Sequence, residues 1–139
     1  MPNPMVVTTI PFHADGELAE ELWQEGASLR EKWGDPWIVL NHEPPACTSV
    51  GGSHGNHDVL NNVLRFSPTY LLGGHIHNVP YHGGFASKVG SSWCFNAGYP
   101  PSTKAAIAPF PNHIIIFEGK ATWRATGLAG VVQQSIDLA

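Results

Sequence analysis

Apolar residues in the chain fall into short runs separated by Pro, Gly and Asn, a pattern that predicts brief strands around two helices. The β-branched run at 5–10 predicts a strand that Pro11 ends. Segment 15–34 has acidic residues near its start and basic residues near its end, which predicts a helix with Asp15 as N-cap and Gly34 as its stop. The residues expected on its apolar face are Leu18, Leu22, Leu29 and Trp33.

Two further apolar runs predict buried strands on either side of a second helix. Residues 37–41 and 69–74 lack polar alternation, which is typical of strands covered on both faces. Between them, apolar residues at helical spacing predict a helix over 56–66, with Asn56 or Ser53 as its cap. A strand, a helix and a strand in this order form a parallel βαβ unit.

The pattern changes to antiparallel strands after His77. The segments "GGFASKVG", "SSWCFNAG" and "NHIIIFEGKATWRATG" predict consecutive strands, the last of them a hairpin that turns at 118–120. Residues 99–111 predict a proline-rich loop, and the tail from Leu128 onward gives no assignable pattern. The fold class predicted from this order is α/β with a mixed sheet, built as a single domain over 1–139.

Composition limits the classes of partner that the chain could bind. The 139 residues carry a formal net charge of −4 and no basic stripe, which argues against a nucleic-acid partner. Neither a signal peptide nor a membrane span is recognisable, so we expect a cytoplasmic protein without a membrane partner. Cys47 and Cys94 form no CxxC pair, which favours reduced thiols. Charged residues make up 13% of the chain, which suggests that part of the surface is covered by a partner.

Three histidines follow the two buried strands and form the candidate metal site. His75 and His77 are two positions apart in "YLLGGHIHN", so an extended backbone points both side chains the same way. His42 follows the other strand, and the carboxyl ends of parallel strands lie at one sheet edge. The sequence therefore predicts that three imidazoles converge, although two spaced histidines alone are more often ordinary surface residues.

Together, "WIVLNHEPP" and "YLLGGHIHN" resemble the second half of the calcineurin-like metallophosphoesterases, and "WCFNAG" continues the likeness. The resemblance implies the C-terminal half of an αββα sandwich, with a parallel βαβ unit followed by antiparallel strands. It implies hydrolysis of a phosphomonoester or phosphodiester, with His42 and His75 as ligands of one divalent ion and His77 of another. Two ions are usual in that family, and Mn, Fe, Zn, Co and Ni all suit such ligands.

The carboxylate motifs of that family are not recognisable here. Asp15 is better explained as a helix cap, Asp35 follows a helix instead of a strand, and His57 in "GNHD" stands where a helix begins. The chain therefore resembles a half-fold that would expose a sheet face, so we expect either a homo-oligomer, such as a dimer, or a missing N-terminal half, as in a truncated protein.

Two other functions stay open at the level of sequence. The chain could be a degenerate, inactive member of the fold that serves as a binding or oligomerisation module and holds one metal ion or none. It could also be a mononuclear zinc hydrolase that uses the three histidines and a water, with Glu43 or Asp58 as supporting carboxylates.

Overall fold

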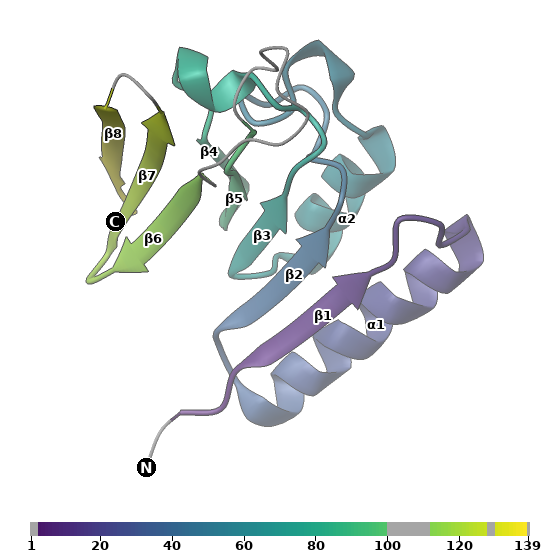
Figure 1. Ribbon diagram of the computed structural model, residues 1–139. Coiled ribbons are helices and arrows are strands. Elements are labelled where there is room, and N and C mark those ends of the chain that lie inside the picture. Colours follow the sequence, from purple (N-terminus) through teal and green to yellow (C-terminus); the bar gives the residue numbers. More distant parts are fainter. Residues whose placement is uncertain (1–2, 100–111, 128–129, 139) are drawn as a thin grey trace.

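The computed structural model describes residues 3–99, 112–127 and 130–138, which form a helix layer and two β-sheets (Figure 1). The larger sheet contains β1 (Val6–Ile10), β2 (Trp37–Asn41), β3 (Tyr70–Gly73), β4 (Ala86–Val89) and β5 (Ser92–Asn96) in the order β1-β2-β3-β5-β4. The smaller sheet is the antiparallel series β6 (His113–Phe117), β7 (Lys120–Gly127) and β8 (Gly130–Asp137). The helices are α1 (Gly16–Trp33) and α2 (His57–Phe66), with short 3₁₀ turns at Gly52–His54 and Val79–His82.

Parallel pairing connects β1 to β2, β2 to β3 and β3 to β5, and only β4 runs antiparallel in this sheet. The predicted βαβ unit is confirmed, and it is repeated, since α1 connects β1 to β2 and α2 connects β2 to β3. The carboxyl ends of β1, β2, β3 and β5 therefore lie at one edge of the sheet. β5 departs from the expected change to antiparallel strands because it pairs in parallel with β3.

Both helices cover one face of the larger sheet, which Figure 1 shows as a layer beside β1 and β2. The core between them contains Trp23 of α1, Val63 of α2 and Leu71 of β3. The sheet's second face is covered over β3 and β5, where Trp123 of β7 packs with Phe95. The described residues thus form a helix layer, a mixed sheet and a second sheet, and the complete αββα sandwich stays a prediction.

Side-chain caps set the ends of the two helices. Asp15 accepts a hydrogen bond from the Leu18 N–H at 2.8 Å, and Asn56 accepts two from the first turn of α2. Both caps were predicted from the sequence, with Asn56 now chosen over Ser53. The Arg30 guanidinium of α1 donates to the Phe66 and Ser67 carbonyls at the end of α2 and lies 5.1 Å from the Trp37 ring. These hydrogen bonds connect α1 to the end of α2.

The side of α1 that faces the sheet is rotated by about one residue from the predicted apolar face. Leu18, Leu29 and Trp33 are exposed, and Leu22 is half-buried. The residues that face the sheet are Ala19, Trp23, Gly26 and Arg30. The reason is Gly26, whose missing side chain lets the helix backbone approach Thr8 and the Trp37 ring, while Trp23 fills the space beside it.

The outer face of β1 is not covered among the described residues. Val7 is 53% exposed and Met5 is 58% exposed, whereas Ile38 and Leu40 of β2 are half-buried. The expectation that β2 is buried on both faces is therefore met on the helix side only. Because β6, β7 and β8 cover β3 and β5 instead, an exposed apolar strip remains beside β1, in line with the exposed face expected from the sequence.

Candidate functional site

His42 and His75 meet at the carboxyl edge of the larger sheet. His42 directly follows β2, and His75 comes two residues after β3. The Nε2 atom of His42 lies 2.9 Å from the Nδ1 atom of His75, and their ring planes cross at 65°. Both side chains are exposed, and Phe12 packs edge-on against the His42 ring at a centroid distance of 4.6 Å. We call His42 and His75 the histidine pair.

The backbone around the pair leaves little room for a side chain at Gly73, the first of the two glycines before His75. The Gly74 N–H donates to the His42 carbonyl at 3.0 Å, which joins the two loops. A Cβ on Gly73 would lie 3.2 Å from the Asn41 carbonyl, so a side chain there would push the loops apart. His75 itself has φ +65°, the left-handed region that few residues with a Cβ adopt. This turn aims its ring at His42.

His77 occupies a different position from the pair. Its ring lies 5.6 Å from the Tyr99 ring, and its carbonyl accepts the Tyr99 N–H at 3.1 Å. The backbone after Gly74 bends instead of continuing as a strand, so the two-residue spacing does not place His75 and His77 on one strand face. Within residues 3–99, 112–127 and 130–138, no group of three or more His, Cys, Asp or Glu is placed to hold a metal ion. The role of His77 as a ligand stays a prediction.

Asn96 holds the loop that carries His75 and His77. This side chain is fully buried at the end of β5 and donates to the Ile76 carbonyl at 2.8 Å and to the Val50 carbonyl at 3.1 Å. The side-chain oxygen of Asn96 accepts the Gly98 N–H at 2.8 Å. The sequence marked "WCFNAG" only as a strand ending in a turn. The pattern gave no sign that the buried Asn96 amide would bind the backbone carbonyl of Ile76, which stands between His75 and His77.

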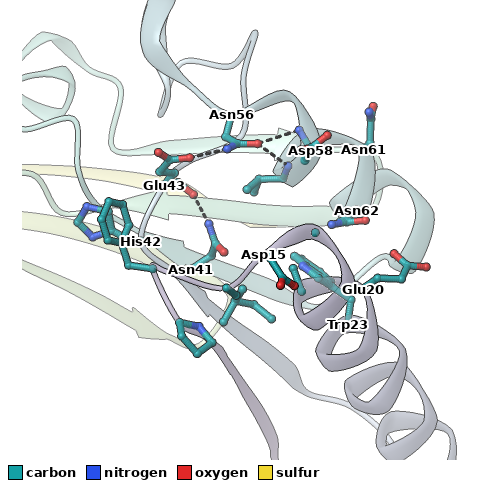
Figure 2. Close-up of a pocket in the computed structure, with 17 residues that line it drawn as sticks. Asp15, Glu20, Trp23, Asn41, His42, Glu43, Asn56, Asp58, Asn61 and Asn62 are labelled. Atoms are coloured by element: carbon teal, nitrogen blue, oxygen red, sulfur yellow. Dashed lines mark hydrogen bonds between the residues drawn. The ribbon is translucent and has the colours of Figure 1, made fainter.

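An open cavity of about 380 Å³ adjoins the histidine pair on the helix side of the sheet edge. His42 belongs both to the pair and to the cavity wall. Figure 2 shows His42 and Glu20 toward opposite ends of this cavity, with Asp15, Glu20 and Trp23 contributed by α1. Asn61 and Asn62 of α2 close another side.

The wall between β2 and α2 is prearranged by hydrogen bonds. The Asn56 amide donates to the Glu43 carboxylate, and the Asn41 amide donates to the Glu43 carbonyl at 2.7 Å (Figure 2). Since Asn56 also caps α2, these bonds fix the loop after His42 to the start of that helix. Sequence analysis did not find the cavity, because its polar residues come from three separate segments.

His57 and the two cysteines are not part of the histidine pair. His57 begins α2 and is exposed, as expected of a residue in an ordinary helix start, and Asp58 follows it in the first turn. Cys47 is exposed and free, and Cys94 is buried and free. Burial raises the pKa of the Cys94 thiol to about 12. None of the helices in the described ranges is long and apolar enough to cross a bilayer.

Comparison with known proteins adds no relative: no family model, no curated protein and no solved structure matches the chain. The geometry of the histidine pair and of the adjoining cavity therefore carries the functional reasoning.

Proposed function

We propose that the chain takes part in metal-dependent hydrolysis of phosphoesters, with His42 and His75 as ligands of one divalent ion and His77 as a ligand of a second. The observation that supports this most is the 2.9 Å separation between Nε2 of His42 and Nδ1 of His75. Two nitrogens that each lie ~2.0–2.1 Å from one ion are themselves roughly 2.9–3.4 Å apart at ligand angles near 90–110°. The separation of the two nitrogens therefore matches two ligand positions of a single ion, which would take the place of the hydrogen bond that joins the rings.

The chemistry of the donors fits the same class of ion. Neutral imidazoles bind Mn, Fe, Zn, Co and Ni, and both rings are exposed at the edge where parallel sheets bind ligands. A bound ion would polarise a phosphoryl oxygen and lower the pKa of a bound water. In the overall reaction, the water oxygen becomes bonded to phosphorus, the bond from phosphorus to the alcohol oxygen breaks, and that oxygen takes up a proton.

The histidine pair provides two donors, and a catalytic site needs at least three protein ligands. We include in the proposal that further donors, carboxylates among them, come from a partner, either a second copy of this chain or a separate chain. The exposed strip beside β1 supports this, because Met5 and Val7 present apolar side chains next to the strand that leads to Phe12 and the pair. A cytoplasmic location is part of the same proposal.

The test is hydrolysis of a chromogenic phosphodiester and a chromogenic phosphomonoester with added Mn²⁺. His42→Ala and His75→Ala should each reduce Mn²⁺ affinity by at least about tenfold and reduce the rate with it. His113→Ala is the matched control, since His113 is exposed on β6 in the other sheet, and it should leave both unchanged. Equal rates for the wild type and His75→Ala would show the proposal to be wrong.

A second function, a non-catalytic binding or oligomerisation module, is favoured by a specific observation. The described residues include no group of three or more metal-binding side chains, and apolar side chains are exposed on β1. Sedimentation together with elemental analysis separates the two functions. A metal-free dimer supports the module, whereas two metal ions per chain contradict it.

A further inference from the structure

We propose that the cavity next to the histidine pair binds the alcohol part of the substrate, and that this alcohol is a neutral, polyhydroxylated group such as a sugar. The inference rests on the proposed phosphoester hydrolysis, because it assigns the phosphate to the pair and the alcohol to the cavity. His42 makes the two sites continuous, since its ring contacts His75 and also lines the cavity.

The charge of the cavity argues against binding of the phosphate itself. Four carboxylates line it, and no Lys or Arg is among its described lining residues; the four are Asp15, Glu20, Glu43 and Asp58. Only Glu20 has a cationic partner, the exposed Arg65 of α2. A phosphate would be repelled from this interior, so it would remain at the histidine pair while the uncharged part of the substrate enters the cavity.

The amides of the cavity distinguish hydroxyl groups from a cationic ligand. Four Asn side chains line it, namely Asn41, Asn56, Asn61 and Asn62. The Asn41 and Asn56 amides each donate one N–H to Glu43, and the Asn56 oxygen caps α2, so each of these two amides offers a ligand its second N–H, while the carboxylates accept only. An ammonium group can donate to the acceptors but cannot accept from amide N–H groups. A hydroxyl does both, so a ligand with several hydroxyls satisfies this mixed lining better.

Size and apolar surface fit the same kind of ligand. A volume of about 380 Å³ lies within the range of small-molecule sites. Ile10, Phe12, Trp23 and Val59 contribute apolar surface to the lining. A sugar presents C–H groups on its ring face and hydroxyls around its rim, so it can contact both kinds of wall at once. Figure 2 shows Asn62 directed toward the side of the cavity that carries Asp15 and Trp23.

The test measures binding of free sugars to the metal-free protein, so that it does not depend on hydrolysis. ¹⁵N-labelled protein is titrated with D-ribose, D-glucose and glycerol, and the side-chain NH₂ signals of asparagine are followed by NMR. Saturable shifts of the signals from Asn41 and Asn62 are expected with at least one sugar. Asn62→Ala should weaken this binding by about 2–10-fold, the effect of losing one to two hydrogen bonds.

Two controls keep a folding defect apart from a binding defect. Ala favours a helix interior more than Asn, so Asn62→Ala should leave α2 intact or slightly more stable. Asn78→Ala removes an exposed amide outside the cavity and should leave the sugar shifts unchanged.

Three outcomes would overturn the inference: no saturable shift with any of the sugars, equal binding by Asn62→Ala and the wild type, or stronger binding of 1,4-diaminobutane than of every sugar. The last would identify a cation site. Sugar binding without hydrolysis would keep the cavity as a sugar site but contradict both the proposed function and the assignment of the sugar as part of a phosphoester. Hydrolysis without sugar binding would contradict this inference alone.

Discussion

Gly26→Ala should destabilise the protein although alanine is the better helix former. Gly26 is buried in α1 where the helix crosses β1 and β2. A Cβ at this position would lie 2.7 Å from Cζ2 of Trp37 and 2.9 Å from its Cε2, and would also clash with the Thr8 hydroxyl. That hydroxyl accepts the indole N–H of Trp37 at 2.9 Å, so the methyl group disturbs a hydrogen bond as well as the packing.

The expected magnitude follows from three contributions. Overpacking costs about 1–3 kcal/mol, and leaving a buried indole N–H without its acceptor costs a further ~1–3 kcal/mol. The higher helix propensity of Ala offsets about 1 kcal/mol of this. The free energy of unfolding should therefore fall by about 1–5 kcal/mol, which lowers Tm by roughly 3–17 °C for a domain of this size.

The assay is urea unfolding followed by tryptophan fluorescence and by circular dichroism. Gly16→Ala is the matched control on the same helix, because no atom lies within 4 Å of the position of its added Cβ. It should change the free energy of unfolding by less than about 0.5 kcal/mol. If Gly26→Ala proves as stable as Gly16→Ala, the close approach of α1 to Trp37 is wrong. The cavity wall formed by Asp15 and Trp23 would then be misplaced too.

Two other predictions concern buried polar groups. At pH 8 the native protein should react with one equivalent of a thiol reagent, at Cys47, and the unfolded protein with two, because burial raises the pKa of Cys94 to about 12. An ordinary cysteine thiol has a pKa of 9.0, so the contribution of Cys94 to the free energy of unfolding should be fully present below pH 9 and be lost as the pH rises toward 12; comparison of pH–stability curves with Cys94→Ala isolates it. Asn96→Ala should cost about 2–4 kcal/mol in urea unfolding, and amide hydrogen exchange at Gly98 should accelerate, since the Ile76 and Val50 carbonyls and the Gly98 N–H lose their partner. Unchanged exchange at Gly98 would contradict the second prediction.

Much of the fold could be predicted because each local signal agreed with the long-range packing. The segment 56–66 combines an Asn cap, helical spacing and a following proline, and α2 begins and ends there. The strand 37–41 matches β2 in both bounds. In β8, by contrast, Val131 and Val132 are exposed and polar residues follow, so the strand depends on pairing with β7 and carries little pattern of its own. The loop predicted at 99–111 lies largely outside the described residues.

In the candidate site, too, some positions could be predicted from the sequence and others could not. His42 and His75 could be predicted to meet, because parallel pairing of β2 and β3 determines where both strands end. The position of His77 depends on the turn at His75, whose positive φ no hydrophobic pattern predicts. The predicted convergence of all three histidines assumed an extended backbone that this turn interrupts.

Under the proposed function, the same edge of the sheet would require a second component. Two imidazoles at 2.9 Å can share an ion, but neutral ligands leave its charge unbalanced, and the Glu43 carboxylate next to His42 already accepts the Asn56 amide. Release of Glu43 would leave the Asn56 N–H without its acceptor. Carboxylates for a metal centre are therefore more readily supplied from outside this wall, by a second component, so under the proposed function measured metal affinity should rise with oligomerisation.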